Sequence, residues 1–521
     1  MAERALTELR DQVRSDRSDR SAGGGRGILA IDQGTTGTTC LVLDEHCTLI
    51  GRAYSEFTQH YPKPGWVEHD AAEIWDVTRR TARHAIAAAR KKGDVQLMGI
   101  GITNQRETVV VWDRATGEPV HRAIVWQDRR TAARCRELKE QGREEWVRER
   151  TGLVLDPYFS GTKLEWLLHN VKGLRERADV GELAAGTIDS WLVFKLTGGA
   201  AHVTDPTNAS RTLLYNIDTL DWDDELLALF GVPRALLPDV RQSAEVYGET
   251  SNDTIGVTIP VAGIAGDQQA ALFGQGCVTP GLAKNTYGTG AFLLLNTGAE
   301  RVASKSGLLT TVGCGPKGEP CYAMEGSIFI AGAAVQWLRD GIRIIERAED
   351  TAVIAASLES NDGVYFVPAF VGLGAPHWNA EARGTIVGLT RGTERAHLVR
   401  AALEAMAYAT NDVLRAMEQD SGIVATELGV DGGASLNDWL MQFQSDVIGL
   451  PVRRPAMVET TALGAAGLAG IATGLWRDAA HFLGERPAPT VFEPRQGDDE
   501  RSALLDGWRR AVSTTLSWAD H

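Results

Sequence analysis

Short apolar runs separated by glycine-rich turns open the folded part of the chain. The runs Gly27–Ile31 and Cys40–Leu43 flank a cluster of glycines and threonines, which predicts a hairpin of two strands. A helix is predicted over Ala72–Lys91, and a further strand over Met98–Thr103. Because strands alternate with helices, the pattern favours a mixed α/β fold.

The same strand–turn–strand pattern begins again about half a chain later. Leu282–Tyr287 and Ala291–Leu295 are predicted strands, and they flank Gly288-Thr289-Gly290. We interpret the two hairpins as parts of two domains of related design that meet near Gly274–Pro280. Hairpins of this kind also arise by chance, so the pattern alone leaves the duplication open.

Length, charge and cysteine content narrow the class of protein. The 521 residues are enough for two or more domains at roughly 100–200 residues each. Acidic residues outnumber basic ones, 68 to 53, for a net charge of −15, which argues against nucleic acid and anionic membranes as partners. None of the six cysteines forms a CxxC pair, so we expect reduced thiols in a cytoplasmic protein.

Two segments resemble targeting or membrane elements only superficially. Residues 1–26 mix arginines with acidic residues and have no apolar core, so we expect a disordered N-terminal extension rather than a signal peptide. Thr460–Trp476 is the longest stretch without Asp, Glu, Lys, Arg or His, but it is short of the ~20 apolar residues that a membrane span needs. Its glycines and alanines predict a buried, closely packed helix and no membrane insertion.

Both predicted hairpins carry turns that suit an anion. Asp32-Gln33-Gly34-Thr35-Thr36-Gly37 follows a buried strand, and Gly288-Thr289-Gly290 has the matching place in the second half. Glycines let backbone N–H groups approach an anion, threonine hydroxyls add donors, and an aspartate at a strand end can hold Mg²⁺ through water. Two such turns would grip a polyphosphate from both sides, although each is also consistent with an ordinary hairpin turn.

Other strand ends carry candidate catalytic and binding side chains. An apolar strand ends at Gly266-Asp267, where a helix begins, so Asp267 can accept a proton from an attacking hydroxyl or cap the helix. Arg106 and Glu107 suit a small polyol but are also consistent with a surface ion pair. Trp126 is a candidate aromatic wall or a core residue.

The second half offers a candidate nucleoside site. Glycines at Asp431-Gly432-Gly433 clear space for a base and ribose, and Gln336 in the predicted helix Ala334–Leu338 can bond to a base edge. No GxxxxGK[ST], HExxH or GxSxG sequence occurs, so the signatures of P-loop kinases, zinc peptidases and serine hydrolases are missing. The single GxGxxG, at Gly313, opens no helix and predicts a hairpin loop.

Together these residues resemble the FGGY family of carbohydrate kinases and, within it, the glycerol kinases. The resemblance runs from about Gly27 to near the C-terminus, and the two family signatures match Tyr158–Trp166 and Gly384–Glu404. It is carried by the motifs IDQGTTG, YPKPGWVEHD, GITNQRET, IVWQDRRT, DPYFSGTK, VTDPTNASRT, GIAGDQQAALFG, KNTYGTG, VPAFVGLGAPHW and VDGGASLNDWLMQFQSD.

The resemblance implies a fold and a division of the chain. It implies an α/β protein with the two-domain actin-like ATPase (ribonuclease H-like) fold and ATP in the interdomain cleft. After the extension 1–26, an N-terminal FGGY domain over 27–275 would hold the polyol site, the first phosphate turn and the catalytic aspartate. A C-terminal FGGY domain over 276–521 would hold the second phosphate turn and the nucleoside. A homo-oligomer, dimer or tetramer, is expected.

The resemblance also implies roles for individual residues. Asp267 would be the general base, and Asp32 and Asp267 would lie near Mg²⁺. Glycerol would be bound by Arg106, Glu107, Tyr158, Asp267 and Gln268, between apolar walls formed by Trp126 and Phe292. ATP would be contacted by Thr35, Thr36, Gly37, Thr289, Gly332, Gln336, Gly433 and Asn437.

The implied activity is ATP-dependent phosphorylation of glycerol to sn-glycerol 3-phosphate in cytoplasmic glycerol catabolism, by in-line transfer. A kinase of another polyol would have a roomier site without the Arg106–Glu107 pair, and a non-catalytic actin-like ATPase would lack a polyol pocket. The first phosphate turn departs from well-known bacterial members, because Gly37 and Thr39 stand where those have Ser and Arg. Backbone donors survive both changes, so ATP binding is expected to persist.

Overall fold

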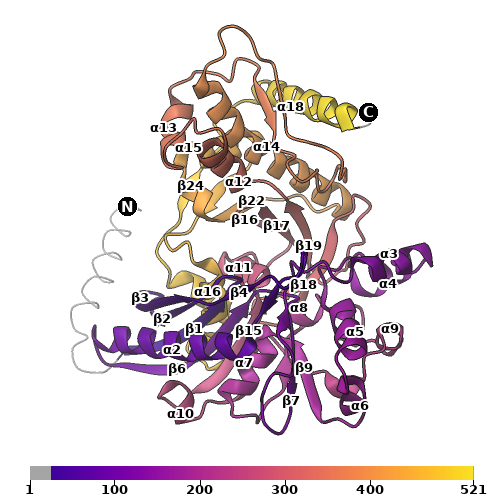
Figure 1. Ribbon diagram of the computed structural model, residues 1–521. Helices are drawn as coiled ribbons and strands as arrows, with labels where there is room; N and C mark the ends of the chain where they lie inside the picture. Colours follow the sequence, from indigo (N-terminus) through magenta and orange to yellow (C-terminus); the bar gives the residue numbers. More distant parts are fainter. Residues whose placement is uncertain (1–24, 520–521) are drawn as a thin grey trace.

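The computed structural model describes residues 25–519, and its N-terminal half is built on a mixed six-stranded sheet (Figure 1). The strand order is β14-β15-β6-β1-β2-β3; β6 is parallel to both β1 and β15, and the other neighbours are antiparallel. The strands are β1 (Gly25–Gln33), β2 (Gly37–Asp44), β3 (Leu49–Glu56), β6 (Val95–Asn104), β14 (Ala244–Glu249) and β15 (Pro260–Gly266). β1 and β2 form the first predicted hairpin.

The C-terminal half repeats this topology in a seven-stranded sheet of order β18-β19-β17-β16-β22-β23-β24. Along β19-β17-β16-β22-β23, the first two pairs of neighbours are antiparallel and the next two are parallel. The pairs along β3-β2-β1-β6-β15 of the first sheet have the same order. The strands are β16 (Leu282–Tyr287), β17 (Ala291–Gly298), β18 (Leu309–Cys314), β19 (Pro320–Ile328), β22 (Glu427–Gly432), β23 (Val452–Arg454) and β24 (Thr490–Phe492). The shared order supports two halves of related design, and β18 and β19 form the hairpin predicted at Gly313.

Two helices lie between the sheets, α11 (Asp267–Gly274) and α16 (Thr460–Ala472) (Figure 1). A Cβ at Gly101 on β6 would lie 2.0 Å from the carbonyl oxygen of Ala465, and one at Gly464 would lie 1.9 Å from that of Ala270. Only glycine permits such an approach, so these positions bring the backbones into direct contact. α16 is the buried helix predicted from the sequence. It follows the expected domain boundary at residue 275, yet it packs on the sheet of the N-terminal half, which the sequence did not predict.

Other helices cover the outer faces of the two sheets. α2 (Ala71–Arg90) packs on β2 and β3, and its first turn is capped by Asp70, whose carboxylate accepts from the N–H groups of Ala72 and Glu73. α7 (Ile188–Leu196) packs on β6 and β15, and α14 (Arg395–Ser421) packs on β17 and β19 of the second sheet. Each sheet is therefore enclosed between an outer helical layer and the α11–α16 pair.

A smaller sheet of order β4-β5-β8-β7-β9 extends the N-terminal half. Its strands are β4 (Gln59–His60), β5 (Glu68–His69), β7 (Val109–Asp113), β8 (Ala123–Ile124) and β9 (Leu183–Thr187), of which β7 and β8 pair antiparallel. The other helices are α3 (Ala132–Glu140), α4 (Glu144–Thr151), α5 (Ser160–Asn170), α6 (Leu174–Asp179), α8 (Pro206–Ala209), α9 (Asp224–Phe230), α10 (Asn252–Ile255), α12 (Gly332–Gln336), α13 (Asp350–Ala356), α15 (Asp438–Ile448), α17 (Ala479–Gly484) and α18 (Asp498–Ala519).

The predicted N-terminal extension lies outside the described residues except for its last two. Gly25 and Arg26 belong to β1, where the guanidinium of Arg26 lies 2.8 Å from the carboxylate of Glu45. This ion pair and the pairing with β6 hold the first two residues of the strand. Within residues 25–519, no helix combines the length and the apolar character needed to cross a membrane.

Candidate active site

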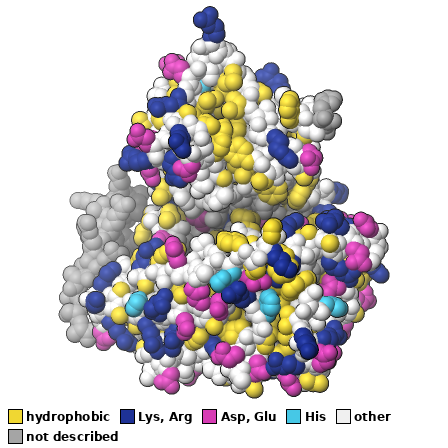
Figure 2. Space-filling model, viewed as in Figure 1, with side chains coloured by type: hydrophobic (Ala, Val, Ile, Leu, Met, Phe, Trp, Pro, Cys, Tyr) yellow, Lys and Arg dark blue, Asp and Glu magenta, His cyan; other side chains and the backbone are white. Residues whose placement is uncertain are grey.

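The candidate residues gather where strands of both sheets end. Asp32 lies near the end of β1, Arg106 follows β6 and Asp267 follows β15. In the second sheet, β16 ends at the turn of Thr289 and β22 ends just before Gly433. The molecular surface is hollowed between the two lobes (Figure 2). Open α/β sheets bind ligands at such strand ends.

A buried network of ion pairs joins the two halves at this point. Arg106 donates from Nη1 to Oε2 of Glu325 on β19 at 2.6 Å. Arg211 donates to Oε1 of Glu107 at 2.7 Å and to Oε1 of Glu325 at 3.0 Å. All four side chains are at most 2% exposed, so a surface ion pair between Arg106 and Glu107 is excluded.

Burial and pairing act on the pKa values of this network in opposite directions. Burial raises the pKa of Glu325, but the guanidinium groups of Arg106 and Arg211 outweigh it and hold that pKa at about 2. Burial also raises the pKa of Glu107, which Arg211 only partly offsets. Because removing one partner from a buried pair typically costs about 3–5 kcal/mol, the network fixes β6 relative to β19.

Asp267 is the first residue of α11, and the N-cap of the helix is Gly266. Its Oδ1 accepts a hydrogen bond from the N–H of Gln268 at 2.7 Å and lies 3.1 Å from Nε of Arg106. Over the described residues, Oδ2 has neither a hydrogen bond nor an ion pair, and the side chain is 33% exposed. The N-cap alternative is therefore wrong, and one carboxylate oxygen is fixed while the other is free to take a proton.

Asp32 is close enough to Asp267 for their charges to interact. Burial and the negative charge of Asp267 raise the pKa of Asp32 to about 7. This pair fits a divalent cation, because Mg²⁺ uses one or two carboxylates and completes its shell with water and phosphate oxygens. Among residues 25–519, no group of three or more His, Cys, Asp or Glu side chains has an arrangement suited to a metal ion, so other oxygens would have to supply the remaining ligands.

A cavity of about 540 Å³ lies beside the ion-pair network, and we call it the aromatic pocket. Its lining includes Trp126, Tyr158, Phe292, Arg211 and Glu325. The rings of Trp126 and Tyr158 meet edge to face at 5.4 Å, and Nε1 of Trp126 donates to Oγ1 of Thr35 at 2.9 Å. Trp126 is thus a pocket wall rather than a core residue, and it ties the first Gly/Thr turn to this pocket.

A second cavity of about 410 Å³, the glycine-lined pocket, belongs to the C-terminal half. Its lining contains all five C-terminal residues that were expected to contact ATP, namely Thr289, Gly332, Gln336, Gly433 and Asn437. A Cβ at Gly332 would lie 2.6 Å from the carbonyl oxygen of Gly288, whereas one at Gly433 would meet nothing within 4 Å. Gly332 is therefore required by the neighbouring backbone, and Gly433 leaves pocket space open.

The first Gly/Thr turn is tight, and its residues are not part of the glycine-lined pocket as the described residues form it. The N–H of Gly34 donates to the carbonyl of Gly37 at 3.0 Å, and Thr36 is exposed. A Cβ at Gly37 would lie 2.7 Å from the ring of Tyr54. It would also lie 2.8 Å from the backbone carbonyl oxygen of Ser55, so a side chain at this position would crowd the neighbouring strand.

Three functional candidates were missed by sequence reasoning, namely Arg211, Lys284 and Glu325. Lys284 is buried and donates from Nζ to Oε1 of Gln268, a residue that we expected at the polyol, and burial lowers the pKa of Lys284 to about 8. Arg211 lies in the motif VTDPTNASRT, and Glu325 is a lone acid in the run Cys321–Ile328. For Lys284 and Glu325, the available signal was a charge inside a buried strand, because such a buried charge requires a partner; Arg211 lies in a turn and offered no such signal.

Comparison with known proteins identifies close similarity to one family. The N-terminal-domain model of the FGGY family of carbohydrate kinases matches residues 27–274, and the C-terminal-domain model matches residues 283–473. The chain is 56% identical to glycerol kinase 2 of Thermotoga maritima, over 94% of this chain and 99% of that protein. It is 58% identical to the glycerol kinase of Carboxydothermus hydrogenoformans, over 94% and 98%. Among solved structures, glycerol kinase of Plasmodium falciparum with ADP matches with a TM-score of 0.90 at 38% identity, over 95% of this chain and 99% of that chain.

Proposed function

This chain belongs to the FGGY family of carbohydrate kinases, and we propose on that basis that it transfers the terminal phosphate of ATP to glycerol. The relatives that are 56% and 58% identical over nearly the whole chain are named glycerol kinases. The observation that carries the proposal is the junction of the buried ion-pair network with the aromatic pocket, beside Asp267. That junction offers polar partners and apolar walls together, which is what a small polyol requires.

The aromatic pocket suits glycerol through both its polar and its apolar groups. Each hydroxyl of a polyol can donate and accept a hydrogen bond, so it pairs with carboxylates and guanidinium groups alike. Nη1 of Arg211 is buried and has no hydrogen-bond partner within the described residues. Because buried donors normally have an acceptor, a hydroxyl oxygen of the substrate would satisfy it. Burial raises the pKa of Tyr158, which keeps its hydroxyl protonated, and Trp126 and Phe292 would cover the carbon chain.

The glycine-lined pocket suits the nucleoside of ATP. Gln336 would bond to the base edge, and the open space beside Gly433 would admit the flat group. The β16–β17 hairpin connects the two pockets, because Thr289 lines the glycine-lined pocket and Phe292 lines the aromatic pocket. A nucleotide lying along this hairpin would direct its terminal phosphate toward the polyol.

We assign the proton transfer to Asp267. Oδ2 of Asp267 would accept the proton of the attacking glycerol hydroxyl while Arg106 and the N–H of Gln268 hold Oδ1 in place. The hydroxyl oxygen forms a bond to the terminal phosphorus, and the bond from that phosphorus to the bridging oxygen of ADP breaks in line. Asp32 and Asp267 would hold Mg²⁺, which when bound neutralises charge on the phosphate oxygens.

A coupled assay of ADP release with a panel of polyols tests the proposal. With ATP and Mg²⁺, glycerol should give the highest kcat/KM, ahead of erythritol and xylulose. A higher kcat/KM for xylulose or erythritol would overturn the choice of substrate. Release of ADP that does not depend on any polyol would favour an actin-like ATPase instead.

We also propose a cytoplasmic homo-oligomer, dimer or tetramer. The six cysteines form no disulfide bond and five of them are buried, which suits a reducing compartment. Size-exclusion chromatography with light scattering would give the mass of the assembly. A monomer at all concentrations would overturn the oligomer.

A further inference from the structure

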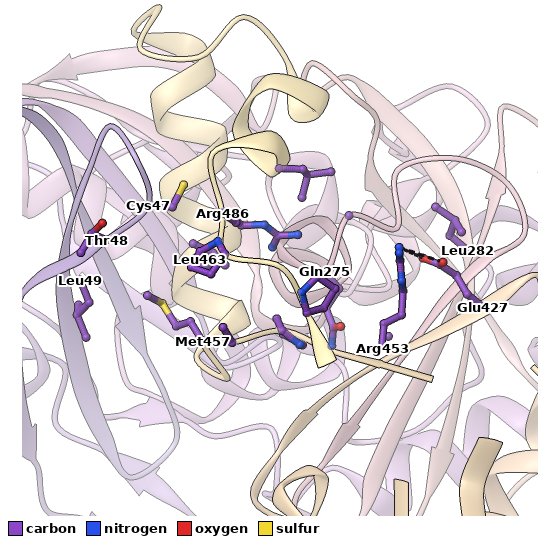
Figure 3. Close-up of a pocket in the computed structure, with 17 residues that line it drawn as sticks. Cys47, Thr48, Leu49, Gln275, Leu282, Glu427, Arg453, Met457, Leu463 and Arg486 are labelled. Carbon is purple, nitrogen blue, oxygen red and sulfur yellow. Dashed lines mark hydrogen bonds and ion pairs between the residues drawn. The ribbon is translucent and has the colours of Figure 1, made fainter. Parts of the chain in front are cut away.

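We propose that a third pocket, at the far end of α11 from Asp267, binds a small organic anion and is coupled to the active site. This rear pocket has a volume of about 510 Å³. Its lining includes Thr48, Leu49, Gln275, Glu427, Arg453 and Arg486 (Figure 3). None of these residues has a part in the proposed phosphoryl transfer.

The rear pocket lies at the strand ends opposite to the active site. β2 begins at Gly37 in the first Gly/Thr turn, and the pocket is formed by the connection after its other end, at Thr48. β22 ends at the glycine-lined pocket, and the rear pocket contains its first residue, Glu427. The two walls therefore come from different sheets, so a ligand that contacts both would favour one relative position of the two halves.

α11 connects the two sites directly. Its first residue is Asp267, and the residue after its last turn, Gln275, lines the rear pocket. The helix is eight residues long, or about 12 Å at 1.5 Å per residue. A shift of Gln275 is therefore transmitted through a rigid element to the proposed base, and binding at either end is linked to binding at the other.

The charges in the rear pocket favour an anion. Arg453 is paired with Glu427 at 3.2 Å, so these two charges compensate each other. Among the described residues, Arg486 has no carboxylate partner; its Nη1 donates to the backbone carbonyl of Gly274. The desolvation of the guanidinium lowers its pKa, which means that its charge lacks the stabilisation that an anion would supply.

A second, independent feature is the side chain of Gln275. Its Nε2 is buried and has no hydrogen-bond partner within the described residues. In Figure 3, Gln275 and Arg486 lie between the wall of Thr48 and Leu49 and the wall of Glu427 and Arg453. The guanidinium of Arg486 also lies 5.5 Å from the centre of the Phe482 ring, but it has no carboxylate partner among the described residues. An amide donor without a hydrogen bond and a guanidinium without a carboxylate, both in one pocket, match a carboxylate or phosphate group.

The rest of the lining indicates the body of the ligand. It is apolar, with Leu49, Met457, Leu463, Leu483, Pro487 and Pro489 among its members. A volume of this size is within the range of small-molecule sites, ~300–1,000 Å³. The ligand class is therefore a carboxylate or a phosphate ester with a compact apolar body.

Isothermal titration of the full chain with benzoate, phenyl phosphate and benzyl alcohol tests the site. At least one of the two anions, benzoate or phenyl phosphate, should bind, and benzyl alcohol, which has no charge, should not. Arg486→Met should weaken binding by at least about tenfold, the loss expected for one charge-assisted hydrogen bond. Glu427→Gln should tighten it, because it removes the acidic group of the pocket. Arg136→Met, which removes an exposed charge on α3, is the matched control and should change nothing.

Several results would overturn the proposal. The first is that neither anion binds at millimolar concentration, and the second is that the alcohol binds as tightly as the anions. The third is that Arg486→Met leaves anion binding unchanged, which would place the anion in the phosphate turns. If Arg486→Met fails to fold, the Glu427→Gln variant provides the test. An anion affinity that this variant leaves unaltered would overturn the site.

The coupling rests on the proposed function and has its own test. The Kd of the anion should change when ADP is saturating, and an unchanged Kd would overturn the coupling alone. If ADP gives no binding heat, the proposed function fails while the rear site stands on the anion titrations.

Discussion

The aromatic pocket and the glycine-lined pocket are built by different means. The lining of the aromatic pocket contains four charged side chains, Arg129, Asp156, Arg211 and Glu325, and the last two belong to the buried ion-pair network. The lining of the glycine-lined pocket has only two charged side chains within the described residues, Arg339 and Glu349, and its shape depends on how closely backbone segments approach at Gly332. We therefore expect the first pocket to bind its ligand mainly through charged groups and the second mainly through its shape.

This difference has consequences for how each pocket tolerates change. A buried charge that loses its partner is costly, so a substitution in the network affects both binding and folding. A pocket shaped by backbone tolerates substitutions that point into free space and resists those that push on a neighbouring carbonyl. The polyol end is therefore expected to be the more demanding of the two.

The largest expected effect is at Asp267, where the two ends meet. Asp267→Asn removes the proton acceptor and should lower kcat on the order of 10²–10⁴-fold, the usual range for a positioned base. Steady-state kinetics measures the loss, and a melting curve checks that the fold persists. Near-normal turnover of a folded variant would show that Asp267 only holds Arg106.

Arg106→Ala tests the polyol end. It would remove a charge-assisted hydrogen bond to glycerol, worth ~1.5–3 kcal/mol or roughly 10- to 150-fold, and should weaken the use of glycerol more than the binding of ATP. Because it also removes the buried bonds to Glu325, a melting curve must show that the variant still folds. Each ligand is titrated separately, with Arg136→Ala as the exposed control. Equal losses for both ligands would place Arg106 in the framework between the halves, where its bond to Glu325 already contributes.

The pH dependence of cation binding tests Asp32. Its pKa is raised from 3.8 to about 7, so the folded protein protonates Asp32 as the pH falls through 7. Mg²⁺ affinity should be roughly tenfold weaker at pH 6 than at pH 8, measured by titration with ADP present.

The same shift affects stability without metal. Since the unfolded carboxyl releases its proton before the folded one, stability should fall between pH 3.8 and about 7 and then stay level. Asp32→Asn should abolish this fall. A Mg²⁺ affinity that is flat from pH 6 to pH 8 would contradict the assignment.

Two glycine substitutions give the smallest effects and separate backbone shape from ligand space. Gly332→Ala pushes on the carbonyl of Gly288 and should cost about 1 kcal/mol, roughly fivefold in ATP affinity, together with a lower Tm. Gly433→Ala meets no protein atom within 4 Å, so it should lower ATP affinity while Tm stays constant. If both variants change ATP affinity and Tm by the same amounts, the distinction between backbone shape at Gly332 and ligand space at Gly433 would be wrong.

The sequence predicted local elements better than it predicted how the two halves meet. The two hairpins, the helix α2 and the buried helix α16 follow from apolar runs and glycine turns, which are local signals. Residue chemistry suggested Gln336 and Gly433 for a nucleoside and Thr289 for an anion, whereas Gly332 and Asn437 were named only through the family resemblance; all five line one pocket.

Contacts between distant segments were not predictable. The bond from Arg106 to Glu325 spans 219 residues, and no pattern within a short window indicates it. The packing of α16 on the first sheet and the contact of Gly37 with Tyr54 depend on the same kind of long-range geometry. The rear pocket is likewise formed by segments from both halves.

The central claim is that the aromatic pocket holds glycerol while the glycine-lined pocket presents ATP to it. The most direct measurement is a competition in one tube, with ATP, Mg²⁺ and equal concentrations of glycerol, erythritol and xylulose, followed by identification of the products by ³¹P NMR and mass spectrometry. The account predicts sn-glycerol 3-phosphate as the dominant phosphorylated product, formed in step with ADP. A dominant phosphate ester of xylulose or erythritol, or ADP and inorganic phosphate without any ester, would contradict it.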